Sequence, residues 1–431
     1  MLPAMSDDRK VPKGKLARFA MLASVGARTG VSLLTKGSAQ AAAERTAEVL
    51  SQMRGLAAKV GQIASYVDGV IPESNREVYE AALGKLRDHA MVSSFDAVKR
   101  TLEKDLGAPL SELFATFEET PFASASIGQV HKATLADGRL LAVKVQHDGV
   151  DVAVESDLAN AGMLEPLANL AAGRKVDSKR VFEEMRTRLR EELDYPLEAE
   201  RQTQFRAIHE GDPTIRVPEV IRDRCGKRVI TSDFVKGRTL TDIALAPEGE
   251  RRAFAETMWR FVFKGNLIGG MFNADPHPGN YIFGEDGVVH FIDFGCVEPI
   301  LGERQSNARG LHLAAVNQDE AGFAAYAKLL LATQGGQWEE MAVAYSRRCF
   351  EPIFGSPYRI TRPFAADLVH RLKAMGKAAR SLPKHEHVPV PKGMVFMNRL
   401  QFGFYSVLAR LDVEVDYAEV ERQFLRKGGL L

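Results

Sequence analysis

The sequence contains little cysteine and no strong excess of charge of either sign. Its 431 residues include three cysteines, Cys225, Cys296 and Cys349, and no two of them form a Cys-x-x-Cys pair. Cysteines so far apart argue against a disulfide framework and a zinc site, and they are typical of a reducing compartment. The formal net charge is +1, which argues against the broad basic field of many nucleic-acid-binding proteins. We therefore expect no nucleic-acid partner.

A long uninterrupted apolar run is also absent. Leu16–Leu34 is fairly apolar but contains two arginines, and no small-residue cleavage site is evident. We interpret it as a helix that lies on a membrane surface or packs on the rest of the protein. Met394–Ala409 is too short and too polar to span a bilayer, which predicts a buried helix. The expected location is cytoplasmic, with peripheral attachment to an anionic membrane surface as one alternative.

What the sequence does contain is an acidic loop followed by a second acidic motif. Asn273–Asn280 reads Asn-Ala-Asp-Pro-His-Pro-Gly-Asn, and Asp293–Gly295 reads Asp-Phe-Gly after one hairpin-like stretch. An acid, an Asn five residues later and a further Asp are the groups with which protein kinases transfer phosphoryl groups, although the usual His-Arg-Asp is missing here. We predict that Asp275 orients or deprotonates the nucleophile and that Asn280 and Asp293 bind Mg²⁺.

A lysine inside a predicted strand is the candidate phosphate ligand. Val130–Leu135 and Leu140–Val145 form a predicted hairpin, and Lys144 has an apolar neighbour on each side. An unpaired buried lysine is costly, so an anionic partner is required unless the side chain points to solvent. The predicted partners are the nucleotide phosphates and Glu198, in a helix that should start near Asp194.

The connection between the two predicted lobes is a candidate adenine site. Val217–Arg222 and Arg228–Val235 are expected to be strands, and the backbone of Asp233, Phe234 and Val235 could bind an adenine edge. An ordinary strand without a ligand is the alternative.

Four separated motifs resemble those of the UbiB/AarF family of atypical protein-kinase-like proteins, which includes mitochondrial proteins that support coenzyme Q synthesis. Lys59–Gln62 reads Lys-Val-Gly-Gln and matches the family's Lys-x-Gly-Gln motif, and Glu192–Asp194 matches its Glu-x-Asp motif. Glu198 falls where the family has its ion-pair glutamate. Ala123–Gln129 is similar to the family's alanine-rich loop, with Ser124 as a small departure, where ordinary kinases have a glycine-rich loop.

The resemblance implies ATP and Mg²⁺ as cofactors and a ligand derived from isoprenoid lipids or quinone precursors. It also implies that the helix with Lys59 and Gln62 covers the place of a protein substrate and meets Glu192 and Asp194 as a regulatory motif. Because alanine cannot adopt positive φ as glycine can, the loop should be stiff. The residues then predicted to bind ATP are Ala123, Ser124, Ala125, Ser126, Lys144, Asp233, Phe234 and Val235.

The predicted fold class is α+β, a bilobal protein-kinase-like fold with an N-terminal helical extension and a helical insertion in the N-lobe. We expect a tail with an amphipathic helix at 1–40, a helical extension with the Lys-x-Gly-Gln motif at 41–117, the N-lobe at 118–236 and a helical C-lobe at 237–431. Within the extension, Phe95–Phe117 is expected to be helical.

The expected function is that of an atypical kinase or ATPase that supports isoprenoid-quinone or other lipid metabolism. Two alternatives remain open: a small-molecule phosphotransferase and a nucleotide-sensing scaffold without phosphoryl transfer. The sequence predicts neither the phosphoryl acceptor nor the oligomeric state.

Overall fold

The computed structural model places most of the chain from residue 92 onward. The predicted tail, the helix with Lys59 and Gln62, the loop residues Ala125 and Ser126, and most of the predicted insertion helix lie outside the described residues. The structure describes residues 92–124, 127–155, 158, 178–383, 386, 388–389 and 391–431.

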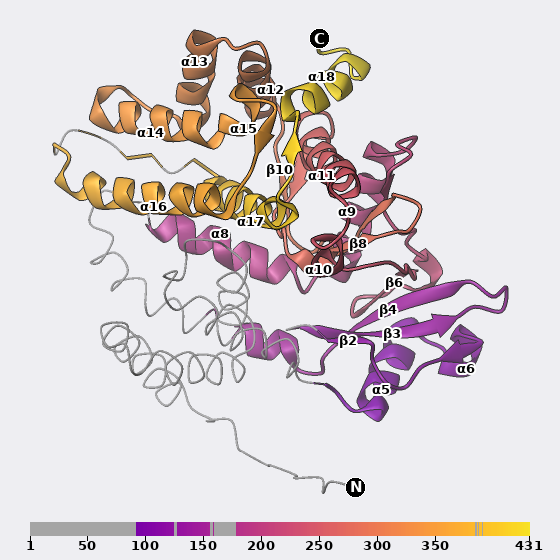
Figure 1. The fold of residues 1–431 in the computed structure, drawn as a ribbon. Helices are drawn as coiled ribbons and strands as arrows, with labels where there is room; N and C mark the ends of the chain where they lie inside the picture. The colour runs from indigo at the N-terminus through magenta and orange to yellow at the C-terminus, as the bar shows by residue number, and fades with distance from the viewer. Residues whose placement is uncertain are drawn as a thin grey trace, which may run out of the picture.

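The first lobe is built on a five-stranded antiparallel sheet (Figure 1). The strand order is β1-β3-β4-β6, and β2 pairs with β3. Leu141, Val143 and Val145 are fully buried on one face of β4, which places Lys144 on the other face. The predicted hairpin around this lysine is therefore confirmed. The strands are β1 (Thr116–Phe117), β2 (Ala123–Ser124), β3 (Gly128–Thr134), β4 (Leu140–Gln146) and β6 (Val229–Asp233).

Two predicted elements need correction. Phe95–Phe117 is not one helical segment: α5 (Phe95–Leu106) ends at Gly107 in the left-handed region, α6 (Leu110–Leu113) follows, and the chain then enters β1. Glycine reaches positive φ without strain and so stops the helix there.

The predicted strand Val217–Arg222 is also absent. β5 (Ile215–Arg216) lies before it, and Val220 makes only an isolated bridge to Ser232. Pro218 has no N–H to donate to a strand ladder, which explains the interruption. β6 likewise ends at Asp233, before Phe234 and Val235.

Two helices join the lobes. In Figure 1, α8 (Ser178–Glu191) runs between the sheet and the helical lobe, and α9 (Tyr195–Ile208) follows it. Asp194 caps α9 by accepting a hydrogen bond from the backbone of Leu197 at 3.0 Å, and a proline lies in the first turn. The predicted helix start near Asp194 is confirmed.

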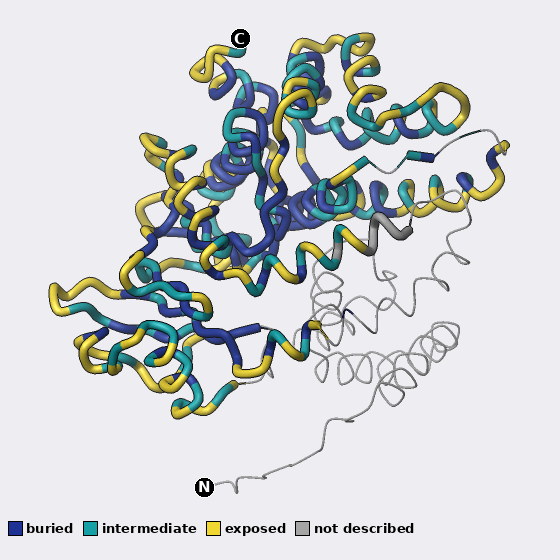
Figure 2. The backbone as a smooth tube through the Cα atoms, turned by 180° about the vertical axis from the view of Figure 1, so that it is seen from behind, coloured by how far each residue is buried: buried dark blue, intermediate teal, exposed yellow. Residues whose placement is uncertain are grey.

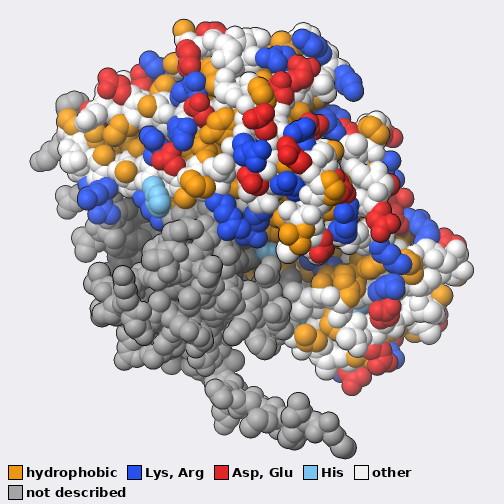
Figure 3. All heavy atoms as spheres, in the orientation of Figure 1, with side chains coloured by type: hydrophobic (Ala, Val, Ile, Leu, Met, Phe, Trp, Pro, Cys, Tyr) orange, Lys and Arg blue, Asp and Glu red, His pale blue; other side chains and the backbone are white. Residues whose placement is uncertain are grey.

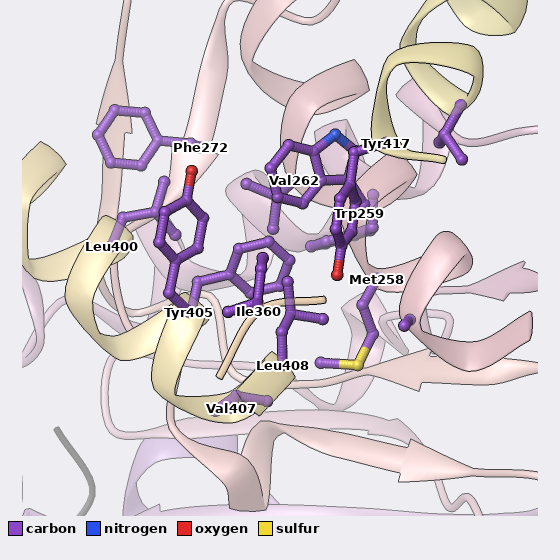
Figure 4. Close-up of a cluster of buried hydrophobic side chains, with 14 of the residues drawn as sticks. Met258, Trp259, Val262, Phe272, Ile360, Leu400, Tyr405, Val407, Leu408 and Tyr417 are labelled. Carbon is purple, nitrogen blue, oxygen red and sulfur yellow. The ribbon is translucent and has the colours of Figure 1, made fainter. Parts of the chain in front are cut away.

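The second lobe is mainly helical and contains the largest hydrophobic core (Figures 1 and 2). Trp259 lies at its centre with no exposed surface, and its ring centroid is 4.2 Å from that of Tyr417 (Figure 4). Its helices are α10 (Leu240–Ile243), α11 (Glu248–Leu267), α12 (Glu303–Val316), α13 (Glu320–Leu331), α14 (Gly336–Cys349), α15 (Glu351–Phe354), α16 (Arg362–Ala378), α17 (Met394–Leu411) and α18 (Tyr417–Lys427).

Short strands in this lobe position the acidic loops. β7 (Met271–Asn273) pairs with β10 (Val297–Pro299), and β8 (Tyr281–Phe283) pairs with β9 (Val289–Phe291), so both acidic motifs are held between strand pairs. A further pair, β11 (Tyr358–Arg359) and β12 (Glu414–Val415), lies on the C-terminal side.

The segment predicted to be a buried helix forms most of α17 and packs in the core of the helical lobe. Among the described helices, none combines the length and apolarity needed to cross a bilayer. Basic and acidic side chains are interspersed over the face visible in Figure 3.

Candidate active site

Lys144 lies between two carboxylates, one from each side of the interlobe region. Its Nζ is 2.8 and 3.0 Å from the two carboxylate oxygens of Glu198 on α9, and 3.4 Å from Oδ2 of Asp293. Glu198 is almost fully buried, whereas the Asp293 side chain is 38% exposed. The structure thus brings together three residues that are 54 and 149 positions apart in the chain.

The electrostatics of this cluster favour a charged lysine. Burial alone would lower the pKa of Lys144, but Asp293 and Glu198 outweigh it and raise that pKa well above its ordinary value. Burial raises the pKa of Glu198, against the attraction of Lys144, and the charges of Asp293 and Glu192 raise it further. Negative charge exceeds positive charge around Lys144, which suits an added cation.

Tyr195 and Gly128 close the sheet side of the cluster. The Lys144 ammonium lies 5.2 Å from the centroid of the Tyr195 ring, a cation–π contact. Burial raises the pKa of the Tyr195 phenol, so the phenol stays neutral. A Cβ on Gly128 would lie 2.7 Å from this hydroxyl and 2.6 Å from the Val145 carbonyl oxygen, so only glycine fits there.

The backbone at Asp293 is in an unusual conformation. Its φ is 66°, in the left-handed region that an L residue adopts at a cost of order 1–3 kcal/mol. The conformation is held from both sides: the carbonyl of Asp293 accepts from Asn273 Nδ2 at 2.7 Å, and its Oδ1 accepts from the Gly295 N–H at 3.2 Å. This geometry turns the carboxylate of Asp293 toward Lys144.

The acidic loop is organised by its own amides. The N–H of Asp275 donates to Oδ1 of Asn273 at 2.9 Å, and Nδ2 of Asn280 donates to the Asp275 carbonyl at 3.0 Å. The backbone carbonyl of Asn280 accepts a hydrogen bond from the Ile292 N–H at 3.0 Å, which connects the loop to the strand before Asp293. Asn280 therefore keeps its amide oxygen as the atom that a cation would take.

Arg399 on α17 contacts the candidate catalytic acid and is the main residue that sequence reasoning missed. Its NH2 donates to Oδ1 of Asp275 at 2.6 Å, and both side chains are largely buried. The two residues are 124 positions apart. The one signal in the sequence was an arginine within a predicted buried helix, which by itself indicates no partner.

Two arginines of the interlobe helices hold the segment after Asp293. Arg201 on α9 donates to the Gly295 carbonyl at 3.3 Å and to Glu191 at 2.6 Å. Arg188 on α8 pairs with Glu298 and donates to the Val297 carbonyl at 3.0 Å. These contacts fix the Asp-Phe-Gly segment relative to Glu198.

Fewer backbone N–H groups are available to bind an adenine edge than the sequence predicted. The backbone N–H of Asp233 donates to Glu219, and that of Phe234 donates to Leu140. Of the three predicted residues, Val235 is therefore the one left to offer its N–H to a nucleotide base. The Asp233 carboxylate pairs with Arg139 at 2.7 Å, on an exposed edge of the sheet.

The remaining predicted residues fall in three places. Ala123 and Ser124 form β2, the strand that leads into the small-residue loop. Asp194 is the exposed cap of α9, whereas Glu192 is buried and lies near Gly295 and Glu198. Lys59, Gln62, Ala125 and Ser126 are outside the described residues, so their predicted contacts stay predictions.

The residues present fit a magnesium ion that is bound together with phosphates. Among the described residues, no three His, Cys, Asp or Glu side chains are grouped as a ready-made metal site. Mg²⁺ is usually bound through one or two carboxylates plus substrate phosphates rather than by an all-protein cage. Asp293, the amide oxygen of Asn280 and the excess of negative charge around Lys144 match that mode.

Known proteins resemble this chain in sequence and in fold. Residues 85–327 match the model of the ABC1 atypical kinase-like domain. The chain is 28% identical over 331 residues to the mitochondrial atypical kinase COQ8 of Saccharomyces cerevisiae, covering 72% of this chain and 65% of that protein. It is 34% identical to the chloroplastic protein ACTIVITY OF BC1 COMPLEX KINASE 7 of Arabidopsis thaliana, covering 56% of this chain and 35% of that protein. The chain thus spans about one third to two thirds of the length of these two relatives.

A solved structure is similar over nearly the whole chain. It is the complex of Rv3197 with erythromycin from Mycobacterium tuberculosis, with a TM-score of 0.61 and 26% sequence identity, and the match covers 95% of this chain and 98% of that one. The α+β, kinase-like fold and the UbiB-type resemblance predicted from the sequence are both confirmed. The chain therefore belongs to the ABC1 family of atypical kinase-like proteins, the family to which COQ8 and its UbiB-type relatives belong.

Proposed function

We propose that the protein binds ATP with Mg²⁺ and transfers or hydrolyses its terminal phosphoryl group. The observation that supports this most is the placement of Lys144 between Glu198 and Asp293, at 2.8 and 3.4 Å. Lys144 is then oriented by Glu198 toward the phosphates of the nucleotide. Val235 offers its backbone to the base, and the loop that begins at Ala123 covers the phosphates.

In this proposal each acidic residue has a separate task. Asp293 and Asn280 would hold Mg²⁺, and the ion would supply positive charge beside the phosphates. Asp275 orients the attacking hydroxyl or water and accepts its proton, while Arg399 holds the Asp275 carboxylate in place. The protein forms no covalent bond to the phosphoryl group in this proposal, so catalysis comes from positioning and charge balance.

The biological role that we propose is support of isoprenoid-quinone or other lipid metabolism by a protein that acts at a membrane surface. The similarity to the mitochondrial COQ8 protein supports this assignment. The phosphoryl acceptor is then a lipid-derived or quinone-precursor hydroxyl, or water.

Metal-dependent nucleotide binding tests the proposal directly. MgATP should raise the melting temperature of the parent protein, and Asp293→Asn should abolish the part of the shift that requires Mg²⁺, because the amide carries no charge to balance the ion. Asp286→Asn is a matched control, since Asp286 lies in the β8–β9 turn and its Oδ1 accepts from the Val288 backbone. Equal MgATP stabilisation of the parent and Asp293→Asn would contradict the metal assignment.

A further inference from the structure

A cavity of about 200 Å³ lies inside the helical lobe, separate from the candidate active site. Side chains of α11, α12, α14, α16 and α17 line it, helices that Figure 1 shows grouped in this lobe, and most of these side chains are apolar. None of the residues proposed to bind nucleotide or metal is in the lining. The proposed function therefore leaves this cavity unexplained.

The volume restricts what the cavity can hold. An apolar cavity of about 150 Å³ is known to stay dry and to bind benzene, and pockets for drug-sized ligands begin at about 300 Å³. A cavity of about 200 Å³ therefore fits one ring with a short substituent.

The cavity lining includes a buried acceptor that is unused among the described residues. Asn266 on α11 is 2% exposed, lines the cavity, and its Oδ1 has no hydrogen-bond partner among the described residues. Leaving a buried carbonyl oxygen unpaired costs free energy that a ligand donor would recover. A hydroxyl group on the ligand can supply that donor.

A histidine that is held in one orientation lines the same cavity. His312 Nδ1 lies 2.8 Å from Oε2 of Glu421, which is fully buried, and the His312 ring packs 5.1 Å from that of Phe263. Phe263 precedes Asn266 by one helical turn, so the two residues lie on the same side of α11. Asn266 and His312 therefore both lie close to Phe263, in a mostly apolar lining that also contains Ser346, Asn398 and Gln401.

The mostly apolar lining favours a neutral ligand. Among the lining residues that the structure describes, Arg304 is the one with a permanent charge. The carboxylate of Glu298 interacts with it electrostatically but also pairs with Arg188, so an anionic probe is needed to measure whether Arg304 attracts negative charge.

We propose that this cavity is a binding site for a neutral, ring-sized apolar molecule with one hydroxyl, and that the hydroxyl donates to Oδ1 of Asn266. The site also has a structural link to the candidate active site. Asn398 and Leu400 on α17 line the cavity, while Arg399 between them reaches Asp275 at 2.6 Å. A ligand that moves α17 also moves Arg399, so binding in the cavity should change the rate of ATP hydrolysis. This second part rests on the proposed function.

Binding is measured first without nucleotide, on the full chain, by calorimetry and ligand-observed NMR. Benzyl alcohol, toluene and benzoate are matched probes that share one ring and differ in the polar group. Benzyl alcohol should bind roughly two- to tenfold more tightly than toluene because of one net hydrogen bond. Failure of benzyl alcohol to bind up to its solubility, or tighter binding of benzoate, would overturn the proposal.

Two substitutions locate the binding. Ala342→Phe on α14 fills the cavity and should abolish binding of both neutral probes, whereas Ala344→Phe, on the exposed face of the same helix, should preserve it. Asn266→Leu should reduce the affinity ratio of benzyl alcohol to toluene to about one, a readout that does not depend on overall stability. Unchanged binding in Ala342→Phe, or an unchanged ratio in Asn266→Leu, would place the probes elsewhere.

ATP hydrolysis with and without benzyl alcohol then tests the coupling. A change in turnover that Ala342→Phe removes and Ala344→Phe retains supports the link through α17. If benzyl alcohol binds at the cavity and turnover does not respond, the coupling is wrong and the site stands. If no ATP is hydrolysed under any condition, the proposed function fails, and the binding result stands independently.

Discussion

Asp275 and Arg399 form a nearly buried ion pair at the centre of the candidate chemistry. The arginine fixes the orientation of the carboxylate, and removal of one partner of a buried pair leaves the other charge uncompensated. At the scale of single residues, this pair sets the orientation of the Asp275 carboxylate.

Arg399→Gln should therefore lower the rate of ATP hydrolysis by at least tenfold with little effect on MgATP affinity, because Arg399 contacts the acid and not the predicted nucleotide ligands. Asp275→Asn should lower it by about 10²–10⁴-fold. Since both act on one carboxylate, the double variant should be little worse than Asp275→Asn alone. Steady-state hydrolysis and MgATP thermal shifts measure both quantities.

Arg399→Lys, which keeps the charge, should recover part of the activity, and Arg426→Gln on the exposed face of α18 is the control. Parent-like hydrolysis by Arg399→Gln would show that the pair has no part in catalysis. Fully additive losses in the double variant would show that the two residues act independently.

At the scale of elements, α9 connects the ion pair of Lys144 to the core of the helical lobe. Glu198 lies in its first turn, and His209 ends it, stacked 4.6 Å from the ring of Phe261. His209 is buried, and neither ring nitrogen has a hydrogen-bond partner among the described residues. Burial lowers the pKa of His209 to about 3, so the folded protein keeps this histidine neutral.

This shift predicts a loss of stability in acid. The unfolded chain takes up a proton near pH 6.5 and the folded chain does not until about pH 3, so stability is present above pH 6.5 and falls as the pH drops through that window. Between pH 7 and pH 5 the loss from His209 should be about 2 kcal/mol. Urea unfolding at the two pH values measures it.

His209→Leu should reduce this pH dependence by that amount, whereas His370→Leu, at an exposed position of α16, should leave it unchanged. An equal pH dependence in the parent and His209→Leu would mean that His209 is protonated in the folded state. A weaker pH dependence of stability in His370→Leu would indicate a general surface effect instead.

At the scale of the whole molecule, the proposed attachment to a membrane depends on the segment before the described residues. Lys13–Lys36 mixes basic and apolar residues in the pattern of an interfacial helix. We expect the full chain to sediment with anionic vesicles at low salt and to be released at high salt, because screening weakens the attraction to lipid headgroups. Nucleotide hydrolysis should rise on the vesicle surface.

A version that starts at Ala41 is the matched comparison and should stay in the supernatant. If both versions sediment equally, another surface binds the lipid. If neither sediments at low salt, the membrane proposal fails and a partner in solution must be sought. The predicted boundaries near residues 41, 118 and 237 also stay predictions, because no measurement described above tests them.

Several parts of the molecule followed from local sequence alone. The hairpin around Lys144, the helix start near Asp194 and the buried helix near Met394 were predicted because alternation, a proline suited to a first helical turn and apolar length are local properties. The acidic motifs indicated a kinase-like family for a similar reason, because phosphoryl transfer requires given residue types at a given spacing. The predicted strand Val217–Arg222 was wrong because Pro218 has no N–H to donate to a strand ladder.

Contacts between distant segments were decided only by the tertiary structure. The sequence by itself determined that an acid, an amide, a second acid and a strand lysine were present, and in which order. It could not show that Arg399, 124 residues after Asp275, pairs with that acid, or that the N–H groups of Asp233 and Phe234 are used within the protein. Nor could it show the cavity beside α17. The physical reason is that ion pairs and cavities depend on how elements pack, and packing brings together residues whose separation along the chain carries no signal.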